Sequence, residues 1–258
     1  MSQPASPSRD SVRAIDRAFD VLEALAAGPV PAATLDIAER TGLPQPTVHR
    51  ILRTLTARSY VRQASDRRYS PGTALIPLAR QSGSALGAVL QPMLVDAVEA
   101  TRESVSVAVL DHGQVRYIAH AASDQSVRVF NEVGNMASLH STGVGKAILS
   151  AMSDEQAETI VGQLALIRST PNTITDPAVL LAQIRKARSQ GYALDDAEYE
   201  IGVMCVAAPI PCRIPLAVSI SGPQPRMTAS FLRQTCLPVL RRLLAELGQA
   251  CDQSSQLP

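Results

Sequence analysis

Side chains that can hydrogen-bond to the edges of bases and to phosphates gather in one short stretch of the chain. They are Gln45, Thr47, His49, Arg50 and Arg53. The same stretch carries apolar residues at the spacing of one helix face, namely Val48, Ile51, Leu52 and Leu55. At about 100° per residue, Arg50 and Arg53 fall opposite to this apolar stripe. We therefore expect a helix whose apolar side packs in a core and whose cationic side faces a nucleic acid.

Local charge and a following hairpin support the same interpretation. Between Thr41 and Ser65 there are four arginines and no acidic residue, whereas solvated helices usually mix the two signs. Two short β-like runs enclose residues 64–67, which predicts a hairpin of wing type with Arg67 and Arg68 at or beside its tip. We expect these two arginines to contact phosphates or the minor groove.

Two helices and a tight turn must position the cationic face. The pattern predicts a helix that Thr34 caps and that Gly42 ends by supplying a positive φ. Pro46 suits the first turn of the next helix, because its missing N–H would have no partner there. An earlier helix, Ser11 to Ala27, is predicted to bury Val12, Ile15, Phe19, Leu22 and Leu25. Three helices and a hairpin form a winged helix-turn-helix, and an ordinary helical hairpin is the alternative.

Composition limits the class of protein. The chain of 258 residues suits two domains, and its net charge of +1 means that affinity for phosphate must come from local charge. Residues 1–75 supply it, with ten arginines against seven acids. The four cysteines form no C-x-x-C pair, and the sequence shows neither a signal peptide nor an apolar run of membrane-spanning length. We expect a cytoplasmic protein with no membrane partner and a disordered tail at residues 1–10.

A linker follows the predicted DNA-binding domain, which covers residues 11–72. Residues 73–91 show a helical pattern that Pro77, Gly83 and Gly87 interrupt, so a kinked linker helix is predicted. Pro92 fits the first turn of another helix, and a second domain, 92–258, is predicted to begin there.

The second domain mixes strand and helix signals. Strands are predicted at 104–110, 115–120, 203–210 and 216–221. Helices are predicted at 142–152, 154–166, 176–190 and 228–250. This order indicates an α+β domain, in which helices pack against a sheet.

Motifs in both halves resemble those of one family. They are IAERTGLPQPTVHRIL (37–52), HSTGVGKAILS (140–150), GYALDDAEYEIGVMCVAAPI (191–210) and SISGPQPR (219–226). Over nearly its full length, the chain resembles the IclR-family transcriptional regulators. The resemblance implies an N-terminal winged helix-turn-helix, a C-terminal GAF-like effector-binding domain, and a homodimer or homotetramer on double-stranded operator DNA. The sequence departs from the family at Pro46, where a small polar residue is common, and at residues 211–214, which replace a longer hairpin.

An anion site is predicted where residues 141–146 enter a helix. The N–H groups of Gly143 and Val144 point outward at the positive end of the helix dipole, where a carboxylate binds favourably. The resemblance places the family's effector contacts at Gly143, Val144, Asp195, Cys205, Ser219 and Ser221, with Val129 and Val203 as apolar walls. Asp195 would repel an anion, so we expect the ligand's carboxylate at the helix end and a hydroxyl, keto or protonated group near Asp195.

These residues also have plainer interpretations. Gly143 and Gly145 can serve close packing, Ser219 and Ser221 can be ordinary strand positions, and Cys205 can be a small buried hydrophobe. The peptide TGVGK lacks the glycine and the hydroxyl of a phosphate loop, so nucleotide hydrolysis is not expected. No short ligand spacing joins His140, Asp195, Cys205 and Cys236, so we expect neither a metal nor another cofactor.

The sequence therefore favours a ligand-responsive DNA-binding regulator of a metabolic operon, for which we expect catabolism and a small organic acid. An enzyme with an accessory winged helix would need a catalytic or metal constellation in 92–258, and the sequence shows none. A constitutive or architectural DNA-binding protein is the other alternative. We hypothesise that the ligand changes the relative orientation of two DNA-binding domains through the linker helix.

Overall fold

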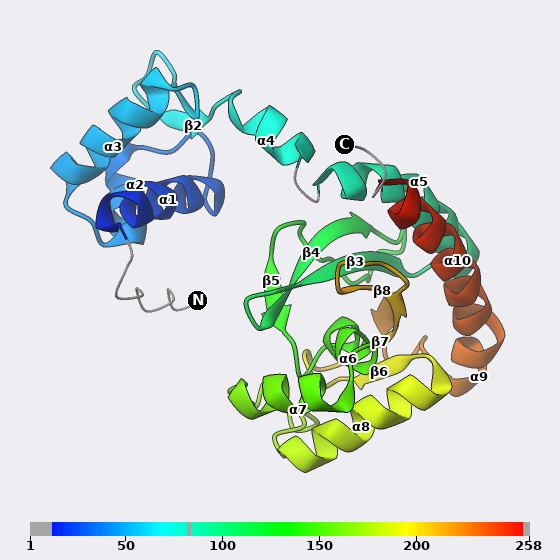
Figure 1. Ribbon diagram of the computed structural model, residues 1–258. Coiled ribbons are helices and arrows are strands. Elements are labelled where there is room, and N and C mark those ends of the chain that lie inside the picture. The colour runs from blue at the N-terminus through cyan, green and yellow to red at the C-terminus, as the bar shows by residue number, and fades with distance from the viewer. Residues whose placement is uncertain (1–11, 82–83, 255–258) are drawn as a thin grey trace. The chain divides into compact units, whose positions relative to one another are not determined.

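The computed structural model describes residues 12–81 and 84–254 (Figure 1). Its contacts divide the chain into two compact units, Met1–Ser82 and Gly83–Pro258. The predicted disordered tail, the predicted helix start at Ser11 and the kink expected at Gly83 lie outside the described residues.

The first unit is a winged helix-turn-helix, as predicted. It contains α1 (Arg13–Ala26), α2 (Thr34–Thr41), α3 (Gln45–Ala57), β1 (Val61–Gln63), β2 (Tyr69–Pro71) and α4 (Leu75–Gln81). The two strands pair antiparallel and form the predicted wing. Within the core, Val48, Leu52 and Leu55 of α3 are buried and Ile51 is half-buried, so the predicted apolar stripe faces inward.

The turn between α2 and α3 follows the predicted backbone chemistry, but the start of α2 does not. Gly42 ends α2 in the left-handed region, with a φ of +67°, and Pro46 is the second residue of α3. The predicted cap at Thr34 is wrong, because Thr34 is already helical and Ala33 is the N-cap. The carboxylate of Asp36 instead accepts the Ala33 N–H at 3.0 Å. The side chain of the third helical residue thus accepts the N–H of the N-cap residue, whereas no N-cap side chain accepts an N–H of the first turn.

The core-facing side of α1 differs from the prediction. Val12, Ile15 and Phe19 are 60%, 53% and 58% exposed, whereas Val21 and Leu25 are fully buried. The helix therefore has apolar residues on two sides, and only the side of Val21 and Leu25 packs against α2 and α3. Helical periodicity identifies apolar stripes but cannot tell which stripe meets the rest of the domain.

The second unit is built on a six-stranded antiparallel sheet, which confirms the α+β fold class. Its strands are β3 (Ser104–Asp111), β4 (Gln114–Ala121), β5 (Met136–Ser138), β6 (Ala193–Asp196), β7 (Val203–Ile210) and β8 (Leu216–Pro223). They lie in the order β5-β4-β3-β8-β7-β6. Its helices are α5 (Ser84–Thr101), α6 (Gly143–Ser150), α7 (Asp154–Gln163), α8 (Pro177–Gln190), α9 (Ala229–Phe231), a π-helical turn (Leu232–Cys236) and α10 (Leu237–Ser254).

Helix α5 corrects the predicted helix start at Pro92. The helix runs through this proline without a break, although a proline in a helix interior removes one backbone hydrogen bond and crowds the preceding turn. Leu90 and Leu94 on either side of it are fully buried in the core. Packing against the sheet therefore maintains the helix where local propensity predicts an end.

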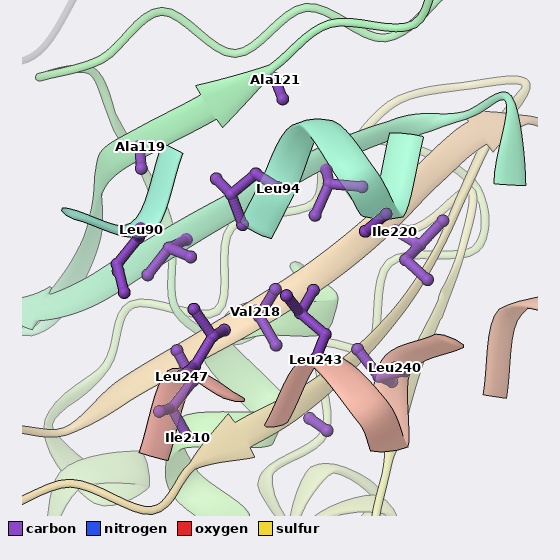
Figure 2. Close-up of a cluster of buried hydrophobic side chains, with 14 of the residues drawn as sticks. Leu90, Leu94, Ala119, Ala121, Ile210, Val218, Ile220, Leu240, Leu243 and Leu247 are labelled. Carbon is purple, nitrogen blue, oxygen red and sulfur yellow. The ribbon is translucent and has the colours of Figure 1, made fainter. Parts of the chain in front are cut away.

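Helices cover both faces of the sheet and so create two cores. On one face, α5 and α10 enclose apolar side chains of β4, β7 and β8, among them Ala119, Ile210, Val218 and Ile220 (Figure 2). On the other face, α6 lies against the sheet, and α7 and α8 pack outside it. Because side chains alternate along each strand, the β-strands contribute to both cores at once.

Candidate functional site

A row of polar side chains crosses the sheet on the face that α6 covers. The antiparallel register pairs Asp195 of β6 with Cys205 of β7, and Cys205 with Ser221 of β8. Ser221 pairs in turn with Ser104 of β3, and all four residues are buried. Directly paired residues project to the same side of a sheet, so residues distant in sequence form one polar strip.

The first turn of α6 lies against this row. A Cβ atom on Gly143 would come within 2.8 Å of the Cys205 sulfur, so glycine allows the helix start to approach β7. The hydroxyl of Thr142 caps the helix by accepting the Gly145 N–H at 3.1 Å. Within the described chain, the N–H groups of Gly143 and Val144 have no hydrogen-bond partner. They form a pair of free donors at the positive end of the helix.

Gly145 has the plainer role that the sequence left open. A Cβ atom on it would overlap the carbonyl oxygen of Leu139, so close packing alone requires glycine there. Gly143 combines close packing with a place beside the polar row.

Part of the loop between β4 and β5, residues 122–135, lies against the polar row at the β3 end. The Ser104 hydroxyl donates to the Val129 carbonyl at 2.6 Å, and the Asn131 amide donates to the Ser106 hydroxyl at 3.0 Å. Ser106 and Ser104 both belong to β3, so the sheet itself holds the loop in place. These two hydrogen bonds position Val129 and Asn131 beside the start of α6.

The loop between β6 and β7, residues 197–202, is held by a buried ion pair. The Nζ atom of Lys146 in α6 lies 2.5 Å from Oε1 of Glu198, and the side chains are 1% and 9% exposed. Oδ1 of Asp195 accepts the N–H groups of Glu198 at 2.8 Å and of Tyr199 at 3.4 Å. Asp195 therefore belongs to the polar row and also holds the loop that follows it through two backbone N–H groups.

One cavity of about 30 Å³ lies among these elements. The predicted effector residues that line it are Val129, Gly143, Val144, Asp195, Val203, Cys205 and Ser221. The remaining predicted residue, Ser219, does not line the cavity. Its hydroxyl lies beside the Cys205 sulfur, on the same face of the sheet as Ser221. Their role in ligand binding stays a prediction.

Sequence reasoning missed the other lining residues, which are Tyr117, Asn131, Thr142, Tyr199 and Glu200. Thr142 had a detectable signal, because a threonine before a helical pattern is a typical N-cap. Tyr117 lies mid-strand and Asn131 lies in a loop, so neither position has a periodic or capping signal. Only the sheet register and the loop path bring them to the cavity.

Burial determines which of the acidic side chains that line the cavity are protonated near neutral pH. Burial raises the pKa of Asp195 from 3.8 to about 7, against the hydrogen bond from the Glu198 N–H and the charge of Lys146. Burial also raises the pKa of the Cys205 thiol to about 12 and raises that of Tyr117. Asp195 thus titrates near neutral pH, while Cys205 and Tyr117 stay protonated.

The outer face of α3 presents the other predicted set. Gln45, His49, Arg50 and Arg53 are exposed, and Thr47 is half-buried at the side of the helix. Among the described residues, neither Arg50 nor Arg53 forms an ion pair with a carboxylate. Their charge is therefore available to an anionic partner.

The two wing arginines differ. Arg67 is exposed at the wing tip in the left-handed region, with a φ of +64°. Arg68 is tied to its own domain, because its guanidinium donates to the Pro31 carbonyl at 3.3 Å and lies 3.9 Å from Asp66. The geometry leaves Arg67 freer than Arg68 to reach a partner.

Residues 12–81 and 84–254 contain neither a metal-binding cluster nor a membrane-spanning helix. No group of three or more histidine, cysteine, aspartate or glutamate residues there could hold a metal ion. Cys236 packs in the core on the opposite face of the sheet from Cys205, which separates two residues considered for zinc. No helix in these ranges is long and apolar enough to cross a bilayer.

Comparison with known families agrees with this geometry. The model of the IclR helix-turn-helix domain matches residues 14–65, and the model described as bacterial transcriptional regulator IclR C-terminal matches residues 82–253. The chain belongs to the IclR family. These matches confirm the predicted family and fold class. They also confirm the predicted function as a ligand-responsive DNA-binding transcriptional regulator.

Individual IclR-family proteins are similar over most of the chain. The transcriptional regulator BhcR of Paracoccus denitrificans is 33% identical over 86% of this chain and 81% of its own length. The acetate operon repressor of Salmonella typhimurium is 31% identical over 86% of this chain and 84% of its own length.

Solved structures show the same fold. Thermotoga maritima IclR superimposes with a TM-score of 0.74 at 28% identity, covering 92% of this chain and 98% of that one. A double mutant of the PobR inducer-binding domain from Acinetobacter, in complex with 3-hydroxybenzoic acid, superimposes with a TM-score of 0.58 at 28% identity. It covers 63% of this chain and 97% of that domain.

Proposed function

We propose that this regulator senses a small organic acid in the cavity below α6 and controls a metabolic operon accordingly. The observation that carries the proposal is the pair of free N–H donors at Gly143 and Val144, directly above the polar row of Asp195, Cys205 and Ser221. Free donors at a helix start favour a carboxylate, and the row below offers partners for a second polar group.

The orientation of the acid follows from charge. Its carboxylate lies at Gly143 and Val144, and its hydroxyl, keto or protonated group lies toward Asp195 and Ser221. A cavity of about 30 Å³ has the volume of one water molecule, so binding requires the β6–β7 loop or the β4–β5 loop to move outward. The complex of the PobR domain with 3-hydroxybenzoic acid supports a ligand of this class.

Operator recognition is assigned to α3 and the wing. Gln45, Thr47, His49, Arg50 and Arg53 enter the major groove of double-stranded DNA. Arg67 reaches phosphate or the minor groove, and Arg68 contributes less because it is held by Pro31 and Asp66.

A homodimer or homotetramer presents two such helices to a palindromic operator. The exposed apolar residues Val12, Ile15 and Phe19 of the α1 region support this, because an apolar stripe in water favours a partner surface. Ile76 and Leu78 of α4 are also more than half exposed. A second copy of the chain is the partner that a two-fold operator requires.

We propose a regulatory rather than an enzymatic role, since the relatives are transcriptional regulators. The protein then acts in the cytoplasm, where its DNA target lies. The name of the acetate operon repressor supports control of a metabolic operon. We propose that this operon is catabolic. The signal passes to the DNA-binding domains through residues 73–91.

The proposal is tested by measuring the thermal unfolding midpoint of the full chain with sodium acetate, pyruvate, 3-hydroxybenzoate and matched neutral alcohols. An acid that raises the midpoint in wild type, and does so much less in Gly143→Ala, supports the proposed pocket. Stabilisation by neutral compounds alone, or equal stabilisation of both proteins, would overturn it.

A further inference from the structure

The buried charges around Asp195 do not balance once an anion enters. Lys146 pairs with Glu198, and Asp195 adds a second buried carboxylate beside the same ammonium group. In the part of the chain that the structure describes, no arginine or lysine lines the cavity. With both carboxylates ionised the cluster carries one net negative charge, and an organic anion would raise it to two.

Among the other groups near Asp195, Glu198 also has a pKa that burial raises, but its ion pair with Lys146 opposes that shift and favours the ionised carboxylate. The titratable or charged groups that face Asp195 or line the same cavity are Lys146 from α6, Glu198, Tyr199 and Glu200 from the β6–β7 loop, Tyr117 from β4 and Cys205 from β7. Burial raises the pKa of Tyr117, Tyr199 and Cys205, so these three groups stay neutral. Glu200 is exposed and can only add negative charge.

We propose that Asp195 takes up one proton from the solvent when an organic anion binds, and then donates a hydrogen bond to the ligand. Oδ1 already accepts two backbone N–H groups, so the proton resides on Oδ2. The anion and the proton enter together, and the net charge of the buried cluster remains minus one. This inference rests on the proposed function as an acid sensor and adds the protonation state in which the acid is bound.

The cost of this protonation is small near neutral pH, because the pKa of Asp195 in the free protein is about 7. At pH 6 most molecules already carry the proton, and binding takes up little more. At pH 8 Asp195 is mostly ionised, and uptake approaches one proton for each bound acid. Affinity for the acid therefore falls by up to about tenfold per pH unit above pH 7.

Titration calorimetry of the full chain measures this uptake directly. The probe is whichever of sodium acetate, pyruvate and 3-hydroxybenzoate binds most tightly, titrated at pH 8 in phosphate and in Tris. The two buffers differ in ionisation enthalpy, so the difference between the observed binding enthalpies gives the number of protons taken up. We expect about 0.5 to 1 proton at pH 8 and close to none at pH 6.

Two variants show which residue takes up the proton. Asp195→Asn keeps the oxygen that accepts the Glu198 N–H and supplies a permanent donor, so it should bind the probe at pH 8 at least as tightly as wild type and without uptake. Asp196→Asn is the matched control, because Asp196 is adjacent, exposed and hydrogen-bonded to Gln224, and it should retain the full uptake.

The outcomes separate the two claims. Equal enthalpies in both buffers at pH 8 overturn the inference and leave the proposed function intact. Uptake that persists in Asp195→Asn overturns the assignment to this residue. If none of the three acids binds wild type, the proposed function fails and this inference fails with it. Should Asp195→Asn not fold, the wild-type comparison at pH 6 and pH 8 still decides.

Discussion

Asp195 and Arg50 represent the two kinds of side chain on which the account depends. Asp195 is 4% exposed, so its surroundings set its protonation. Arg50 is exposed and has no ion-pair partner in the described chain, so its charge is available to DNA. The role of Asp195 is tested by the pH dependence of stability, and the role of Arg50 by the dependence of DNA affinity on operator sequence.

Asp195→Asn should change how the free energy of unfolding depends on pH. The pKa of Asp195 in the folded protein, about 7, lies above its ordinary value of 3.8, so the folded state binds this proton more tightly. The resulting stability is complete below pH 4 and is lost as pH rises through 7. Between pH 5 and pH 8, wild type should lose about 2 kcal/mol relative to the variant. Urea unfolding at both pH values measures this, and parallel losses in the two proteins would contradict it.

Arg50→Ala should weaken operator binding and relax specificity. If Arg50 pairs with a base, discrimination at one operator position falls by about 1 to 3 kcal/mol. Fluorescence anisotropy with single-base operator variants measures both effects. The matched control is Arg185→Ala, which removes the same charge from an exposed site on α8. An unchanged affinity and sequence preference would remove Arg50 from the reading face.

The sequence predicts the residues of the candidate site unevenly. Gly143, Val144 and Thr142 belong to a local helix start, which short-range patterns reveal. Asp195, Cys205 and Ser221 become neighbours only through the sheet register, so for them the family resemblance was needed. Ser219 lies on the same face of β8 as Ser221 and beside the Cys205 sulfur, but it does not line the cavity, so its role in binding stays a prediction.

At the scale of elements, the start of α6 connects the fold to the proposed ligand. Its approach to β7 depends on a glycine at its first residue and on the cap at Thr142. A single methyl group added at this helix start should therefore test directly whether the acid binds there.

Gly143→Ala should reduce affinity for the acid at least tenfold. The new Cβ would lie 2.8 Å from the Cys205 sulfur, so either α6 or the side chain must move, at a cost of about 1 to 3 kcal/mol. Gly162→Ala in α7 is the matched control, because a Cβ there meets open space and should stabilise the helix by up to about 1 kcal/mol. Calorimetry with the acid and urea unfolding measure the two effects. Acid binding by Gly143→Ala at wild-type affinity would show that the helix start is not the site.

Element prediction succeeds where local pattern and tertiary packing agree. The hairpin of β3 and β4 and the helix pair of the first unit were both predicted from local signals. The start at Pro92 was wrong because packing of α5 on the sheet outweighs the proline. The short strands β5 and β6 were not predicted, since three or four residues are too few to show a period of two.

At the scale of the whole molecule, Val12, Ile15 and Phe19 form an apolar stripe that is exposed in the described chain. Sequence periodicity had assigned this stripe to the core. Assembly explains why apolar residues persist there, because residues that face water in one chain can be buried between two.

Phe19→Lys should therefore separate two modes of DNA binding. We expect at least a tenfold loss of affinity for a palindromic operator and an unchanged affinity for a single half-site, because only the former requires paired domains. Ile214→Lys, at an exposed apolar position in the second unit, is the control. Equal losses on both DNAs would place the effect in folding or direct contact rather than in pairing.

An acid bound in the cavity beside the start of α6 should change operator occupancy. The direct test is the operator affinity of the full chain at pH 7, measured by fluorescence anisotropy with and without a saturating acid, using an operator selected from random DNA. We expect a change of at least about fivefold in wild type and a clearly smaller change in Gly143→Ala at the same acid concentration. An acid that demonstrably fills the cavity and leaves the wild-type operator affinity unchanged would contradict it.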